Sequence, residues 1–136
     1  WVAPDYRGKG FGSSIVKVTE AVMRQNRAGA MIGEFNDPML MTPEERELDR
    51  LAGVTPEGRL VFWARQGYTQ LDAPYVQPPL EGQTVPVEHL MFGYKPFGTG
   101  FARDGMSAGQ YVRVLEAYFG SFVTNLEDNS HWIRLR

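Results

Sequence analysis

The stretch that decides the fold is "VAPDYRGKGFGSS", residues 2–14. It places Gly8, Gly10 and Gly12 at alternate positions, directly before apolar residues with the spacing of a helix. Glycine inside a helix or strand costs roughly 0.5–1 kcal/mol relative to alanine, so this pattern indicates a backbone that must approach something closely. Because backbone N–H groups at the start of a helix attract negative charge, we expect an anion to bind there.

The composition is that of one globular domain. The chain has 136 residues, of which 43% are hydrophobic and 22% charged, so we treat residues 1–136 as a single domain. Its net charge of −2 argues against a general nucleic-acid partner. No apolar run approaches the roughly 18 residues that a membrane-spanning helix needs, so no membrane partner is expected. The absence of cysteine excludes disulfides and is compatible with the cytoplasmic location that we expect.

The remaining patterns predict alternating helices and strands, and hence the α/β class. Apolar spacing predicts a helix over about 11–27, with the stripe Phe11, Ile15, Val18 and Val22, and a buried strand over 30–35. Cap signals predict helices that start after Thr42, Thr55 and Ser107. Two further strands are expected over 75–80 and 87–95.

Three phosphate-loop templates can be compared with the glycine stretch. A Walker A loop needs serine or threonine after its lysine, but Gly10 follows Lys9. A dinucleotide-binding loop needs a third glycine where this chain has Ser13. The template R/Q-x-x-G-x-G/A is matched at every position by residues 7–12.

This stretch resembles the phosphate loop of the GCN5-related N-acetyltransferase superfamily. The resemblance implies an acyl-CoA N-acyltransferase-like mixed sheet flanked by helices, with acetyl-CoA or another acyl-CoA as co-substrate. It implies that the loop holds the pyrophosphate of that co-substrate through Arg7, Gly8, Lys9, Gly10, Phe11, Gly12 and Ser13.

A second resemblance follows the strand over 30–35. Family members carry an asparagine after this strand, and here that residue is Asn36, which the resemblance implies would touch the cofactor or a water. A later helix of the family ends in a pattern similar to "FWARQGY", residues 62–68 of this chain. The resemblance covers residues 1–95, and residues 96–136 form a C-terminal extension with an extra helix. One departure is Trp63, which stands where the family often has a proton-donating tyrosine. The other is the long segment 37–55, which would lie across the cleft or pack on the surface.

Two residues are the catalytic candidates. Glu34 at the end of the strand over 30–35, with Asp37 as its neighbour, could accept a proton from an amine, or could be an ordinary surface or capping carboxylate. Tyr68, with Tyr75 as the second choice, could replace the missing acid, or could be a packed aromatic residue.

The expected function is acyl transfer from CoA to an amine acceptor, a small molecule or a protein. The alternatives are a catalytically silent acyl-CoA-binding or sensing domain, and an interaction module built around the last helix. The strand that ends near Ala3 retains few residues, so we read the chain as the C-terminal part of the fold, with its N-terminal strands absent. The missing N-terminal half or a homodimer is the partner expected on this reading.

Overall fold

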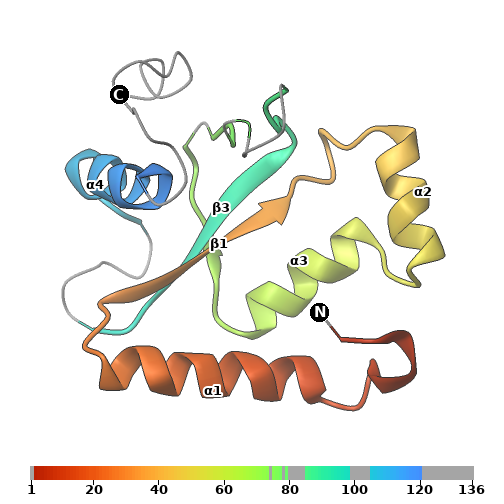
Figure 1. The fold of residues 1–136 in the computed structure, drawn as a ribbon, viewed down its shortest axis with the longest axis horizontal. Helices are drawn as coiled ribbons and strands as arrows, with labels where there is room; N and C mark the ends of the chain where they lie inside the picture. The colour runs from red at the N-terminus through yellow and green to blue at the C-terminus, as the bar shows by residue number, and fades with distance from the viewer. Residues whose placement is uncertain (1, 74, 78, 80–84, 99–104, 121–136) are drawn as a thin grey trace.

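The structure is a computed structural model that describes residues 2–73, 75–77, 79, 85–98 and 105–120. It belongs to the α/β class, with α-helices packed around a small antiparallel sheet (Figure 1). No helix in these ranges is long and apolar enough to cross a membrane. The elements in chain order are α1 (Phe11–Gln25), β1 (Ala30–Asn36), α2 (Pro43–Leu51), α3 (Pro56–Arg65), β2 (Thr69–Gln70), β3 (Leu90–Pro96) and α4 (Ala108–Phe119).

The sheet has the order β1-β3-β2, and both pairings are antiparallel. The mixed sheet that the resemblance implied is therefore not seen among the described strands. The strand expected over 75–80 is also wrong for the part described, where Gln77 makes only an isolated bridge with Val87. Prolines lie close by, and a residue without an N–H cannot continue a ladder. The strand expected over 87–95 is confirmed as β3, and that over 30–35 as β1.

The helix boundaries follow the local cap signals. Thr42 and Ser107 each form the predicted capping box, in which a side-chain oxygen accepts from a backbone N–H three residues later. Thr55 accepts from the Gly58 N–H in the same way at the start of α3. After α3, Gly67 adopts a φ of +85°, the left-handed conformation that suits a residue just beyond a helix end.

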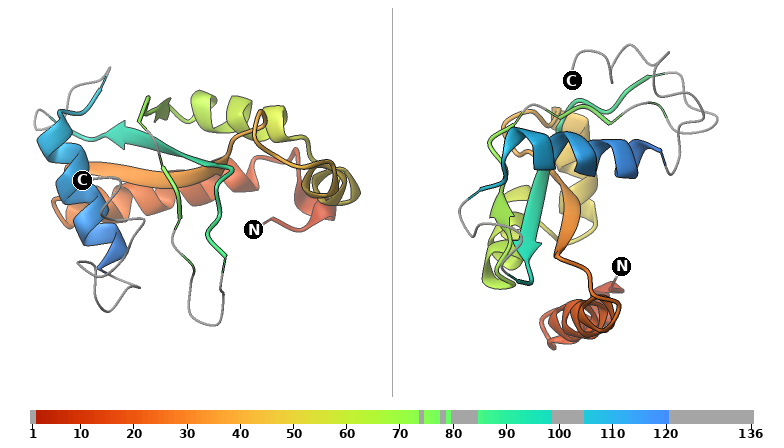
Figure 2. Two further views of the ribbon diagram at one scale, coloured as in Figure 1. Left: turned by 90° about the horizontal axis from the view of Figure 1, so that it is seen from above. Right: turned by 90° about the vertical axis from the view of Figure 1, so that its left-hand side faces the viewer.

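The sheet separates two groups of buried side chains. Helix α4 covers one face, where Leu115 and Phe119 pack against Phe92 and Tyr94 of β3. Helices α1 and α3 lie on the other face (Figure 2), where Val16 joins the cluster that includes Phe35 and Met91. Even-numbered residues of β1 and β3 therefore face α4, and odd-numbered residues face α1 and α3.

The apolar stripe of α1 does not face the sheet. Phe11, Ile15, Val18 and Val22 are 48–64% exposed, and Val16 is the buried residue of this helix. The stripe lies on a different side of the helix from Val16, because successive residues are rotated by about 100°. Helical spacing thus predicted the element correctly but not which of its faces is buried.

Candidate ligand-binding site

The glycine loop joins a short 3-10 turn, Pro4–Tyr6, to the start of α1. Gly8 and Gly10 have φ values of +72° and +84°, in the left-handed region that glycine enters at little cost. A Cβ atom at either position would have no neighbour within 4 Å. The backbone at these two glycines therefore borders open space. Gly10 is also the N-cap of α1, and it has no side chain that could accept hydrogen bonds from the N–H groups of the first turn.

The end of the loop is fastened to α3. A Cβ atom at Gly12 would lie 3.3 Å from Cζ of Phe62, so glycine permits the close approach of the two helices. Next to it, Gln66 Nε2 donates a hydrogen bond of 3.0 Å to Ser13 Oγ. These contacts hold the first turn of α1 in place beside α3.

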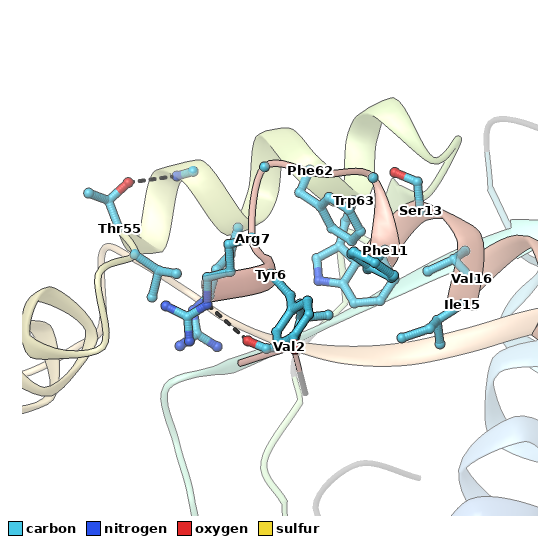
Figure 3. A pocket seen from close by; sticks show the side chains of 16 residues that line it. Val2, Tyr6, Arg7, Phe11, Ser13, Ile15, Val16, Thr55, Phe62 and Trp63 are labelled. Atoms are coloured by element: carbon cyan, nitrogen blue, oxygen red, sulfur yellow. Dashed lines mark hydrogen bonds between the residues drawn. The ribbon is translucent and has the colours of Figure 1, made fainter. Parts of the chain in front are cut away.

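A cavity of about 690 Å³ opens between the loop, α1 and α3 (Figure 3). Its volume lies within the range of roughly 300–1,000 Å³ that is usual for ligand sites. Aromatic rings form much of the wall, and two arginines provide positive charge. The residues that line the cavity include Tyr6, Arg7, Phe11, Thr55, Arg59, Phe62 and Trp63.

Arg7 is anchored by backbone carbonyl groups on two sides of the site. Its Nε donates to the Val2 oxygen over 3.0 Å, and its Nη1 donates to the Ala52 oxygen. Ala52 directly follows α2, and Val54 and Thr55 line the cavity. The segment 37–55 was expected to lie across the cleft or to pack on the surface. Its C-terminal end borders the cavity.

Not every residue predicted to bind the cofactor reaches this cavity. Arg7, Gly8, Gly10, Phe11, Gly12 and Ser13 line it. Lys9 does not; its Nζ lies 5.7 Å from the centroid of the Tyr6 ring. Asn36 is also outside the lining, at the end of β1 opposite Leu90.

Glu34 lies on the α4 face of the sheet, opposite Phe92 of β3. The Tyr75 hydroxyl donates a hydrogen bond to it, and Gln77 Nε2 lies 3.0 and 3.2 Å from its two carboxylate oxygens. Burial and the hydrogen bond to Glu34 raise the pKa of Tyr75. Glu34 thus belongs to a hydrogen-bonded cluster beside the α4 core and does not line the cavity.

Tyr68 lies on the other face, in the cluster with Phe35. Its hydroxyl is buried and has no hydrogen-bond partner among the described residues. Burial is the main cause that raises the pKa of Tyr68 to about 12. Tyr68 and Trp63 border a separate hollow of about 140 Å³, and Trp63 lines the larger cavity as well. The two catalytic candidates, Glu34 and Tyr68, are therefore on opposite faces of the sheet.

Several lining residues were not predicted from the sequence. Arg59, Phe62 and Val54 come from α3 and from the turn before it, far from the glycine loop in the chain. Phe62 belongs to the stretch 62–68 that carries the second resemblance, but no motif marks Arg59 or Val54. Their place at the site depends on how α3 packs against α1.

No family model, curated protein or solved structure matches this chain. The resemblance to the acetyltransferase superfamily therefore stays a prediction, and the interpretation of the cavity depends on its own geometry.

Proposed function

We propose that this chain is an acyl-CoA-dependent N-acyltransferase that moves an acetyl or similar acyl group directly from CoA to an amine. The observation that carries the proposal is the glycine loop at the start of α1, which opens on a cavity of about 690 Å³ lined by Arg7. Phosphate groups suit this end of the cavity, since helix N-termini supply N–H donors and positive potential.

The rest of the cavity fits the less polar parts of such a ligand. The rings of Phe11, Phe62 and Trp63 offer apolar surface to the pantetheine arm and the acyl group. Because the chain contains no cysteine, a cysteinyl acyl-enzyme is not available within it. We therefore propose direct transfer, in which the amine nitrogen attacks the thioester carbonyl carbon and gives up one N–H proton. The C–S bond breaks, and the CoA thiolate leaves and takes up a proton.

The proton transfers need an acid and a base among the side chains near the cavity. The Trp63 indole donates a hydrogen bond but is no useful acid near neutral pH. Tyr68 would keep its proton at neutral pH because its pKa is about 12, and it borders the hollow that also contacts Trp63. Glu34 could act as a base only on an amine that arrives from the α4 face.

A silent acyl-CoA-binding or sensing domain is the second candidate function. The observation that favours it is that the described cavity lining includes no carboxylate, histidine or other evident general base. Measuring CoA release in the presence of varied amines distinguishes the two functions, because a sensor binds CoA without turnover.

The interaction module is the third candidate. It was expected around the last helix, α4, but Leu115 and Phe119 of α4 are buried in the core. The exposed surface that favours such a module is the apolar stripe of α1. An exposed apolar stripe is typical of a surface that binds another protein, and this one consists of Phe11, Ile15, Val18 and Val22. In addition, the outer edge of β1 pairs with no other strand among those described, so it could bind a further strand. A second copy of this chain, one of the partners expected from the sequence, would cover both features. Light scattering of the purified chain tests for self-association.

The loop itself is tested by Gly10→Asp. Aspartate tolerates a positive φ better than most residues, but it places a negative charge beside the proposed phosphate site. We expect the affinity for CoA, measured by isothermal titration calorimetry, to fall roughly 100-fold or more, since like charges in a binding site cost several kcal/mol.

Gly109→Asp is the matched control, because Gly109 lies in the first turn of α4 with open space around its Cβ position. It should leave CoA affinity unchanged. Equal CoA affinity of wild type and a folded Gly10→Asp variant would contradict the proposal.

A further inference from the structure

Two helices meet at the cavity through an ion pair. Arg59 of α3 lines the cavity, and its Nη2 lies 2.5 Å from Oδ1 of Asp49 on α2. Asp49 is 6% exposed, whereas 45% of the Arg59 side chain is accessible. The pair thus joins a buried carboxylate to a guanidinium group on the cavity wall.

Burying the Asp49 carboxylate raises the free energy of the folded state unless a counter-charge such as Arg59 compensates for it. Taking an ionised carboxylate out of water is unfavourable, and a close counter-charge offsets that cost only in part. Asp49 Oδ2 has no hydrogen-bond partner among the described residues. The buried Asp49 carboxylate therefore adds little to the stability of the fold. This favours a different role, in which Asp49 holds the Arg59 guanidinium in one orientation.

The arginine has donors to spare. A guanidinium carries five N–H donors in a planar fork, and the hydrogen bond from Nη2 to Asp49 uses one of them. This fork matches the oxygens of a phosphate group, and arginine keeps its charge at any pH of interest. The partly accessible side chain can therefore contact an anion in the cavity while Asp49 holds its other edge.

The same end of α2 positions both arginines of the cavity. Asp49 contacts Arg59, and the carbonyl oxygen of Ala52, just beyond the helix, accepts from Arg7. The two cationic groups are thus held by one short stretch of chain, although they belong to different elements.

We propose that Arg59 is a second phosphate-binding residue of this cavity and that Asp49 is the positioning residue that orients it. This inference depends on the proposed function, because it assigns Arg59 to a phosphate of the CoA ligand. It gives the segment 37–55 a role in binding that the sequence did not indicate.

The test compares CoA affinity of the intact chain and its variants by calorimetry at low and high salt. We expect Arg59→Gln to weaken binding about 10- to 100-fold, as for loss of a charge-assisted hydrogen bond, and to reduce the salt dependence. Arg65→Gln is the matched control, since Arg65 is an exposed arginine at the end of the same helix and outside the cavity lining. It should bind CoA like wild type.

A double-mutant cycle tests the positioning role of Asp49. Asp49→Asn should weaken CoA binding in the wild-type background and have no further effect once Arg59 is Gln, because Asp49 acts through Arg59. A purely structural role for Asp49 would weaken binding equally in both backgrounds and would overturn the assignment. Thermal melts establish that each variant is folded, and if Asp49→Asn is not, Asp49→Glu replaces it in the cycle with the same expectation.

The failures of the two proposals are distinguishable. A wild-type chain that binds no CoA contradicts the proposed function and this inference together. Binding that Gly10→Asp abolishes but a folded Arg59→Gln leaves unchanged contradicts this inference alone.

Discussion

The two faces of the sheet are packed to different degrees. On the α4 face, four buried side chains are at most 1% exposed, those of Phe92, Tyr94, Leu115 and Phe119, and the other two of the cluster, Leu71 and Tyr75, are 7% and 5% exposed. On the opposite face, the cluster around Val16 and Phe35 is 6–8% exposed, and the larger cavity lies next to it. The first face is a core, whereas the second combines a thinner core with space for a ligand.

Aromatic rings pack on both faces, and on the α1 and α3 face Trp63 contacts both Phe35 and Tyr68. The closest pair of described rings lies on the α4 face. The Tyr75 ring lies 3.9 Å from that of Phe92 between centroids and is stacked on Phe119 at 6.1 Å. Rings in such contact contribute beyond the area that they bury. The two faces thus differ in the burial of their side chains and in the cavity between α1 and α3, and both contain aromatic contacts.

The largest expected effect on stability comes from shortening a buried side chain on the α4 face. Leu115→Ala should lower the free energy of unfolding by about 2–5 kcal/mol, because it leaves a cavity among fully buried neighbours. Leu60→Ala removes the same atoms from a partly buried site on the other face and should cost less than about 2 kcal/mol. Urea denaturation of both variants measures the difference, and equal losses would show that the two faces contribute alike.

A smaller difference in stability is expected between the hydroxyl deletions of two buried tyrosines, Tyr75 and Tyr68. Tyr75→Phe removes a hydroxyl that donates to Glu34 and should cost about 1.5–3 kcal/mol, the usual range for a hydrogen bond to a charged group. Tyr68→Phe removes a buried hydroxyl without a described partner, so we expect no loss or a gain of up to about 1 kcal/mol. The same denaturation experiment compares them, and a large loss for Tyr68→Phe would reveal a partner for its hydroxyl.

The smallest effect at neutral pH concerns the ionisation of Tyr68. Burial raises its pKa from 10.0 to about 12, so the folded state favours the neutral phenol. This contribution to stability is fully present below pH 10 and is lost as the pH rises towards 12. Unfolding followed across this range should show a falling free energy, and Tyr68→Phe should make the fall less steep. An unchanged slope would mean that Tyr68 ionises alike in the folded and unfolded chain.

The sequence predicted the local elements well because their signals act over a few residues. The caps at Thr42, Thr55 and Ser107 are bonds between a side chain and a backbone N–H three positions away. Likewise, the alternating glycines predicted a loop at the start of a helix, and this is confirmed, because Gly10 is the N-cap of α1.

The strand expected over 75–80 and the orientation of α1 show where such local reasoning fails. A strand needs a partner across the sheet, and apolar residues near prolines did not reveal that Gln77 would form a single bridge. In α1, the stripe and Val16 are both apolar, so periodicity alone could not determine which of them packs inward.

What the sequence by itself determined is the succession of helices and strands and the glycine loop at the head of α1, since short-range hydrogen bonds and backbone sterics govern both. Only the tertiary structure decided that Glu34 and Tyr68 lie on opposite faces of the sheet. It also decided that Asp49 holds Arg59 at the cavity. These placements depend on the register of β1 against β3 and on the packing of α2 beside α3, and no spacing of residues along the chain encodes either.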